Sequence, residues 1–448
     1  MDCRKRTAEN GSPRIDGRND GMGTRLALIQ GPGCAIMSSM FMEVIETKRA
    51  GIYAGWIGFG NLGDEAMYGI CRERFPSVSW STSYQLSYRP DGAQWLRRGA
   101  TDARHLVREF GVELRRQPRL RKLAAQGAHG LVKLLGGEVG LLGGGTLINR
   151  APWNLATYRD LRKRTRSLVP IFGSGVASPE FWSSHPEWKD TRKEWVSALA
   201  ELPIAGVRGP NSLAFLREAG AENVVVSGDP AIAFHARYRN PPAWVRPDRP
   251  LRVGVNTGDC SGNLWGRPDN IQHALVALAQ WLRQQKHHVE LLPVWGKDLE
   301  PCQQVARIAG LPESTVSAPL TTPDKFLKKV ETFDLLIAVK LHAAVLASAA
   351  NVPCIVLEYQ PKCLDFAASI GWERFTIRTS QLTPDQLIDK TALLVEQLGP
   401  ARQELSWNVG RLERQFEEYC RRIEPLILGK GAACYPASPS RTAAGWGA

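Results

Sequence analysis

The sequence predicts an α/β protein with two Rossmann-like domains and a cleft between them. Three observations predict this class. The chain has 448 residues, more than one hydrophobic core usually supports. Short apolar runs of strand length alternate with helical stretches, which is typical of a parallel sheet covered on both faces. This alternation stops at a proline-rich segment near residue 240 and then begins again.

In the first half, each expected strand is followed by a glycine-containing turn and a helical stretch. The strands are expected at residues 52–57, 139–142, 169–172, 204–207 and 224–226. The sequence NPPAWVRPDRP then begins at residue 240. Its prolines exclude a helix or a central strand, so residues 241–250 are expected to form a linker.

In the second half the same alternation predicts a second sheet. Strands are expected at residues 251–255, 289–294, 335–339 and 355–357, and helices at 271–285, at 323–332, from about His342, and over most of 384–428. The expected organisation is a disordered extension at 1–50, domains at 51–240 and 251–428, and a disordered, low-complexity tail at 429–448.

Composition narrows the classes of function. No run of 18 apolar residues is present, so no membrane-spanning helix is expected. The nine cysteines are scattered without CxxC spacing, which argues against a disulfide framework and a zinc site and favours a reducing, cytoplasmic location. We expect neither a metal nor a cofactor.

The net charge of +13 is concentrated in residues 97–133 and 159–166. One interpretation is solvated helix faces; the other is a surface that attracts an anionic membrane or a lipid-diphosphate acceptor. Since neither an aromatic platform nor a helix-turn-helix pattern lies nearby, nucleic acid is not an expected partner.

The first chemistry-bearing turn is GFGNLGDE at residues 58–65, between an expected strand and a helix. Its letters match the dinucleotide fingerprint GxGxxG, but Asp64 and Glu65 would crowd a pyrophosphate with negative charge. Two roles stay open for Asp64: a helix cap, or contact with a sugar hydroxyl or catalysis. Asn61, in the same turn, is a candidate substrate-binding residue.

Two further turns suggest close approach of a ligand. Gly143, Gly144 and Gly145 follow a buried strand, and three glycines cost enough conformational entropy to need a reason, either a ligand or a neighbouring backbone. Arg208 lies between two glycines at another strand end, just before a helix that Pro210 can start. It is either a surface salt-bridge residue or a clamp for a carboxylate or phosphate.

The most distinctive stretch is Lys340-Leu341-His342, where a buried strand gives way to an alanine-rich helix. A buried lysine needs an opposite charge, and an anionic ligand can supply it. His342 can exchange protons near neutral pH. Lys362 follows the next strand and is expected to add a second cation. The alternative is a satisfied core histidine beside a snorkelling lysine.

These stretches, in this order, resemble the polysaccharide pyruvyl transferase family. The carriers of the resemblance are GNLGDEA (60–66), GGGTLI (143–148), GSGVAS (173–178), GVRGPNS (206–212), GDPAI (228–232) and KLHAAVLASAANVPCIVLEYQPK (340–362). The resemblance implies a fold like that of the two-domain GT-B glycosyltransferases, with the active site in the cleft. It also implies transfer of the enolpyruvyl carbons of phosphoenolpyruvate to a sugar, as a pyruvate ketal across two hydroxyls.

Carried over by position, the resemblance implies that Arg208, Lys340, Leu341 and His342 contact the donor. The family usually has arginine where this chain has Lys340, and lysine keeps the charge but loses the two-pronged geometry. His342 is the expected general acid/base, with Asp64 as a base on the acceptor side.

Two other functions stay open at this point. One is a GT-B-type glycosyltransferase that uses a nucleotide sugar. The other is a catalytically degenerate member that only binds carbohydrate. The identity of the acceptor saccharide and its attachment to a lipid carrier do not follow from the sequence.

Overall fold

The computed structural model describes residues 49–58, 60–82, 139–148, 152–182, 191–241, 244–258, 260 and 263–429. The extension and tail expected to be disordered, and the basic segment 97–133, lie outside these residues except at positions 49, 50 and 429. Within them, every strand pairs in parallel with its neighbours. The expected α/β class is confirmed.

The strands before residue 240 form a four-stranded sheet in the order β2-β1-β3-β4, with a separate pair, β5-β6. Their bounds are β1 Arg49–Ala54, β2 Val78–Thr82, β3 Val139–Gly143, β4 Ile171–Phe172, β5 Ala205–Val207 and β6 Val224–Val226. An isolated bridge between Ser174 and Val207 continues the parallel arrangement from β4 towards β5.

The strands after residue 250 form a five-stranded sheet in the order β11-β10-β9-β7-β8. Their bounds are β7 Arg252–Asn256, β8 His288–Leu291, β9 Leu335–Ala338, β10 Cys354–Glu358 and β11 Thr376–Arg378. The two sets of strands therefore fall on either side of the expected linker. Their division into separately folding domains stays a prediction.

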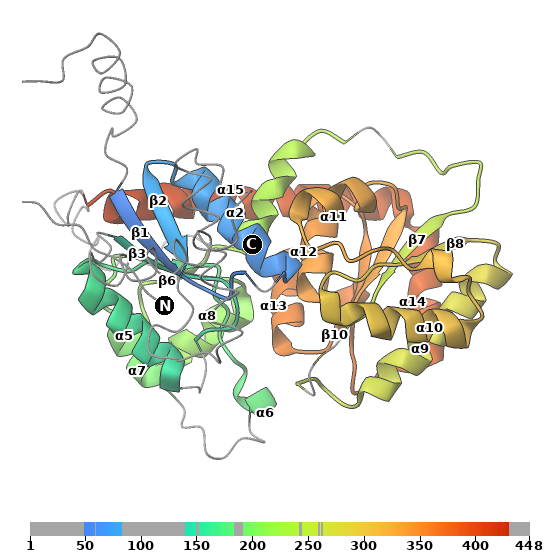
Figure 1. Ribbon diagram of the computed structural model, residues 1–448, viewed down its shortest axis with the longest axis horizontal. Coiled ribbons are helices and arrows are strands. Elements are labelled where there is room, and N and C mark those ends of the chain that lie inside the picture. The colour runs from blue at the N-terminus through green and yellow to red at the C-terminus, as the bar shows by residue number, and fades with distance from the viewer. Residues whose placement is uncertain are drawn as a thin grey trace, which may run out of the picture. The chain divides into compact units, whose positions relative to one another are not determined.

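The helices connect and cover these strands (Figure 1). They are α2 Leu62–Arg74, α5 Pro152–Thr165, α6 Pro179–Trp182, α7 Arg192–Leu199, α8 Pro210–Glu218, the 3₁₀ helix η1 Pro230–Arg237, α9 Pro268–Gln284, α10 Leu299–Ala309, α11 Pro323–Val330, α12 Leu341–Ala349, α13 Pro361–Ser369, α14 Pro384–Glu396 and α15 Leu398–Ile427. Short 3₁₀ turns occupy η2 Gly296–Asp298, η3 Glu313–Thr315 and η4 Glu373–Phe375. None of the described helices is long and apolar enough to cross a bilayer.

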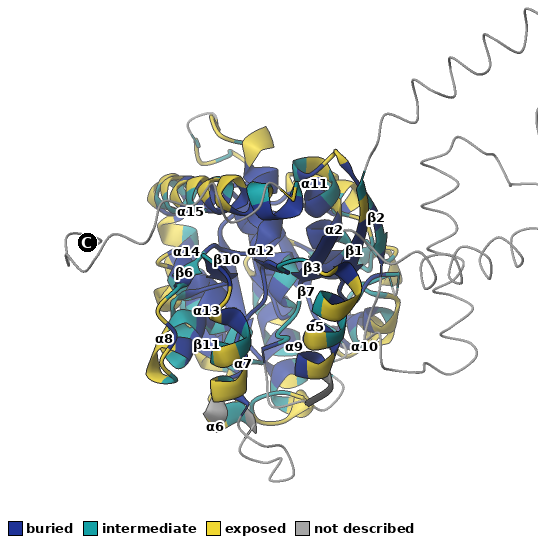
Figure 2. Ribbon diagram, turned by 90° about the vertical axis from the view of Figure 1, so that its left-hand side faces the viewer, coloured by how far each residue is buried: buried dark blue, intermediate teal, exposed yellow. Residues whose placement is uncertain are grey.

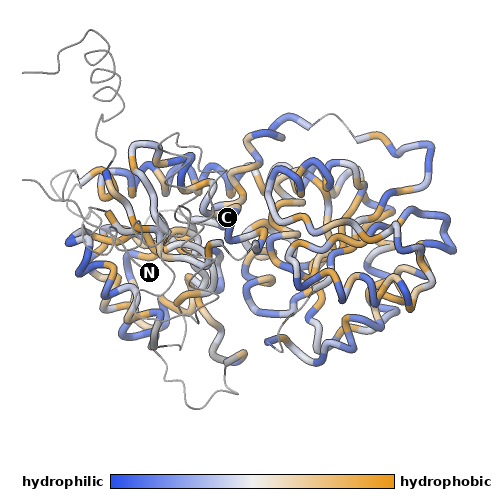
Figure 3. The backbone as a smooth tube through the Cα atoms, viewed as in Figure 1, coloured by the Kyte–Doolittle hydropathy of each residue, from blue (hydrophilic) through white to orange (hydrophobic). Residues whose placement is uncertain are grey.

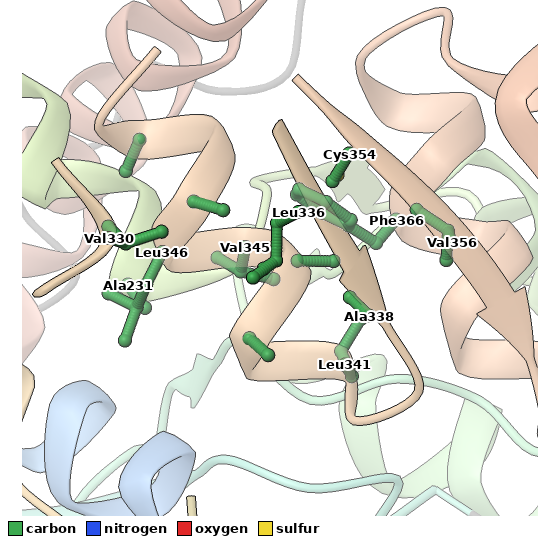
Figure 4. Close-up of a cluster of buried hydrophobic side chains, with 14 of the residues drawn as sticks. Ala231, Val330, Leu336, Ala338, Leu341, Val345, Leu346, Cys354, Val356 and Phe366 are labelled. Carbon is green, nitrogen blue, oxygen red and sulfur yellow. The ribbon is translucent and has the colours of Figure 1, made fainter. Parts of the chain in front are cut away.

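Helix α12 is buried nearly all round, whereas α9 and α15 each keep an exposed face (Figure 2). The small residues of α12 let this helix lie among β9, β10, η1 and α15. Apolar residues run along the strands of this region (Figure 3) and meet α12 in one core (Figure 4). This packing fixes the start of α12, and with it the position of His342.

Helix α15 packs against the four-stranded sheet. The Tyr419 hydroxyl donates a hydrogen bond to the carbonyl of Ile171 in β4. The Phe416 ring packs against Phe172 at 5.5 Å between centroids. The last helix is therefore part of the core that covers the earliest strands.

Candidate active site

The described site is centred on Asp229, which begins η1 directly after β6. One carboxylate oxygen, Oδ2, lies 3.0 Å from Nε of Arg208 and 3.3 Å from Nε2 of His342. The other, Oδ1, accepts a hydrogen bond from the backbone of Ala231 at 3.0 Å. Arg208 follows β5 and His342 lies in α12, after β9. Asp229 thus joins a side chain that follows a strand before the expected linker to one that follows a strand after it.

Arg208 is completely buried. Its Nη2 donates to the carbonyls of Gly145 at 3.2 Å and Gly173 at 3.1 Å, so the guanidinium also holds two glycine turns. The sequence left a salt bridge and an anion clamp open, and the structure shows a salt bridge, which is internal. Nη1 has no hydrogen-bond partner among the described residues. An unused donor on a buried guanidinium calls for an explanation, and contact with an anion is one.

Asp229 remains ionised beside these cations. Burial alone would raise the pKa of Asp229, but the charges of Arg208 and of His342, which is protonated at low pH, together with the hydrogen bond from Ala231, hold that pKa at about 2. A permanently charged carboxylate can orient the His342 imidazole and stabilise its protonated form.

The His342 ring lies directly on Gly63, the second residue of α2. A Cβ atom at position 63 would overlap the imidazole around Nδ1. Burial lowers the pKa of His342, although Asp229 acts in the opposite direction, so the ring is neutral near pH 7. A proton on Nε2, facing Asp229, leaves Nδ1 as the proton-accepting atom. Glycine at position 63 is what allows the ring this position.

Asn61, not Asp64, is the N-cap of α2. Its side-chain oxygen accepts from the backbone N–H of Gly63 at 3.2 Å. The capping interpretation of Asp64 is therefore wrong, because the helix begins three residues earlier than that role requires. Asp64 lies in the first turn with its side chain buried, and burial raises its pKa to about 7, despite the opposing charge of Lys362. Substrate binding by Asn61 stays a prediction.

The raised pKa of Asp64 predicts a pH-dependent stability. A carboxyl group that is harder to ionise in the folded state makes the fold less stable as the pH rises from ~4 towards 7. The variant Asp64→Asn cannot ionise, so relative to wild type it is expected to gain about 2–3 kcal/mol of unfolding free energy between pH 5 and pH 8. Urea unfolding at both pH values measures this gain. Asp324→Asn, at an exposed carboxylate, is the control, and an equal gain there would contradict the prediction.

The glycine turn at 143–145 makes room for neighbouring groups. A Cβ at Gly143 would overlap the ring and hydroxyl of Tyr53. Gly144 and Gly145 have φ of 73° and 63°, which favour glycine. The Tyr53 hydroxyl is buried without a hydrogen-bond partner among the described residues. Its pKa is raised by burial, then by neighbouring groups that include Asp64.

Two lysines add charge beside Arg208. The Lys340 ammonium lies 3.5 Å from the buried carboxylate of Asp298, and that of Lys362 lies 5.0 Å from the centre of the Tyr359 ring. The pKa of Lys362 is lowered to about 8, mainly by burial and also by repulsion from Arg208 and Lys340. Lys362 therefore lies close enough to Arg208 and Lys340 to be repelled by both, and a bound anion would relieve that repulsion.

The structure thus brings together Arg208, Lys340, His342, Lys362 and Asp64. The side chain of Leu341 instead points into the hydrophobic core (Figure 4). Its contact with a donor stays a prediction.

Sequence reasoning missed Asp229, Asp298, Tyr53 and Gly63 as site residues. Asp229 stands in a strand-end motif that was recognised but given no role. Its position beside two cations depends on the pairing of distant segments. The described residues contain no group of three or more His, Cys, Asp or Glu side chains that could hold a metal ion.

Comparison with known proteins gives one family match. A family model described as polysaccharide pyruvyl transferase matches residues 61–361, more than half of the chain. No curated protein matches the chain.

Solved structures show more distant likeness. An S. aureus MnaA–UDP structure has 12% sequence identity and a TM-score of 0.48, covering 84% of this chain and 97% of that one. A putative UDP-N-acetylglucosamine 2-epimerase from Listeria monocytogenes has 11% identity and a TM-score of 0.49, covering 84% and 97%. A UDP-GlcNAc 2-epimerase from Neisseria meningitidis, bound to UDP-GlcNAc, has 10% identity and a TM-score of 0.49, covering 83% and 99%. At these scores the likenesses carry no argument about function.

Proposed function

Because the chain belongs to the polysaccharide pyruvyl transferase family, we propose that it transfers the enolpyruvyl carbons of phosphoenolpyruvate to a saccharide. The product is a cyclic pyruvate ketal across two hydroxyls. The acceptor is a sugar of a polysaccharide, free or on a lipid carrier. The observation that carries the proposal is the gathering of Arg208, Lys340 and Lys362 around the paired His342 and Asp229.

The charges of this site suit a small, multiply charged donor. Phosphoenolpyruvate carries a carboxylate and a phosphate, and each needs at least one cation. Arg208 is rigid, because it is buried and held by Asp229 and two carbonyls. Lys362 and Lys340 are partly exposed and can reach a ligand. The donor would hold Lys362 in its charged form by supplying a counter-charge.

The reaction needs one proton delivered and two removed. The methylene carbon of the donor gains a proton, the first sugar hydroxyl attacks the adjacent carbon, and phosphate leaves with its bridging oxygen. The second hydroxyl then closes the ring, and the proton balance is completed on the phosphate. Asp64 was expected to act as a base on the acceptor side, but its pKa of about 7 suits the delivery of a proton, and we propose that role instead. The neutral His342 suits removal of one from an acceptor hydroxyl, and Asp229 would stabilise the imidazolium that forms.

Phosphate release tests this function directly. The purified protein is incubated with phosphoenolpyruvate and a set of saccharide acceptors, and we expect inorganic phosphate and an acid-labile ketal in equal amounts. Parallel incubations replace phosphoenolpyruvate by UDP-sugars. Release of UDP with glycosylated acceptor, and no phosphate from phosphoenolpyruvate, would establish the nucleotide-sugar alternative instead.

We also propose peripheral contact with an anionic membrane. A cytoplasmic location stays a prediction. In the described part of the chain, α5 and the residues after it line a hollow of about 500 Å³ with Arg159, Arg162, Lys163, Arg166, Ser167 and Leu168. Arg162 is already paired with Glu201. We expect co-sedimentation with phosphatidylglycerol vesicles that weakens between 50 and 300 mM salt, and none with phosphatidylcholine alone. Equal sedimentation with both lipids would contradict it.

A further inference from the structure

A buried carboxylate from one side of the site caps a helix on the other. Asp365, in α13, accepts hydrogen bonds from the backbone N–H groups of Asn211 at 2.8 Å and Ser212 at 3.2 Å. It also accepts from the Ser212 hydroxyl at 2.6 Å. These residues form the first turn of α8, which carries no side-chain cap of its own. Asp365 therefore supplies from α13 the acceptors that the start of α8 lacks.

The contact is built into the backbone on both sides. A Cβ at Gly209, the residue before α8, would overlap Asp365, so glycine is needed for the two segments to approach. The Ser212 hydroxyl also accepts a hydrogen bond from the backbone of Val176 at 2.8 Å. This connects the glycine turn after β4 to the contact between Asp365 and the start of α8, which we call the joint. Asp365 is 4% exposed, so water does not compete effectively for these bonds.

The joint lies within one helical turn of two of the site's cations. Lys362 precedes Asp365 by three residues on α13, and Arg208 precedes Ser212 by four residues on the segment that leads into α8. The charge of Arg208 acts on both Lys362 and Asp365, which places all three groups in one neighbourhood. A shift of α13 along α8 would therefore change the separation between the guanidinium and the ammonium directly.

We propose that Asp365 is a positioning residue that sets the spacing between Arg208 and Lys362, and so the size of the anion that the site accepts. This inference rests on the proposed function, because the spacing matters to a donor with two anionic groups. Since the carboxylate occupies the anion-binding position at the N-terminus of α8, the donor's own anionic groups are held by side chains around it and not by that helix end.

The test weakens the joint by substituting each of its two partners in turn. Asp365→Asn keeps the size of the side chain but loses its charge, and Ser212→Ala removes the hydroxyl on α8. We expect each variant to raise KM for phosphoenolpyruvate about tenfold while kcat falls less than threefold. The double variant should be no worse than the poorer single variant, because both changes break one connection. The pH profile of kcat should stay that of wild type, since neither residue transfers protons.

Asp385→Asn is the matched control. This aspartate lies in α14 and, unlike Asp365, is exposed, so its replacement should leave KM unchanged. A purely structural role would lower the melting temperature of both test variants and leave KM within twofold of wild type, which would overturn the inference. Additive effects in the double variant would overturn it too. Wild-type protein that releases no phosphate from phosphoenolpyruvate would instead contradict the proposed function.

Discussion

Replacing His342 by alanine is expected to lower kcat for ketal formation by about 10²–10⁴-fold, the usual contribution of a general acid or base. The neutral ring is held by Asp229 on one side and by Gly63 on the other. The KM for phosphoenolpyruvate should change much less than kcat, because the three cations remain in place.

Steady-state kinetics on purified His342→Ala measures both quantities, and His273→Ala is the control. His273 lies on α9 and is exposed, so its loss should change neither constant. A His342→Ala variant that keeps at least half of the wild-type kcat would remove the catalytic assignment. If that variant also kept the biological effect of the wild-type chain, the non-catalytic, carbohydrate-binding alternative would be favoured.

Substituting Gly63 by alanine is expected to reduce activity by roughly 10²-fold, although the residue touches no part of the donor in our proposal. The added Cβ would overlap the His342 ring, so the imidazole must move. A displacement of about 1 Å in a reacting group can cost that much in rate. The helix itself should not suffer, since alanine stabilises a helix interior by about 0.5–1 kcal/mol relative to glycine.

The same helix offers a matched control for this prediction. Gly69 is an exposed residue of α2, and no atom outside its own helix turn lies within 4 Å of a Cβ built there. Gly69→Ala should therefore keep full activity and raise the melting temperature slightly. Kinetics and thermal unfolding of both variants measure the two effects. If Gly63→Ala were as active as Gly69→Ala, the contact between α2 and the imidazole would not matter for catalysis.

The sequence predicted the parallel α/β class because the apolar runs and glycine turns are local signals. The strand at 224–226 has the expected bounds, and the helix expected from about His342 begins at Leu341. Strand β2 was not expected, although Val78, Trp80 and Thr82 alternate with more exposed residues. Five residues of that kind give only a weak local signal, and the strand is fixed by its pairing with β1.

The candidate site was predicted only in part, for a physical reason. Arg208, Lys340, His342 and Lys362 each follow a strand or begin a helix, so each has a local signal. Asp229 was overlooked because its importance comes from two partners, 21 residues before it and 113 after it. Likewise, nothing around Gly63 in the sequence says that a ring from α12 lies against it. Such contacts become visible only when distant segments are placed together.

The packing of α15 has a consequence for the order in which the protein matures. The strands β1 to β4 leave the ribosome first, yet Tyr419 and Phe416, which cover β4, are synthesised near the end of the chain. A nascent chain stalled after residue 250 would carry a sheet whose Phe172 keeps Phe75 as a neighbour but lacks Phe416. The strands made first are therefore incompletely covered until α15 has been synthesised.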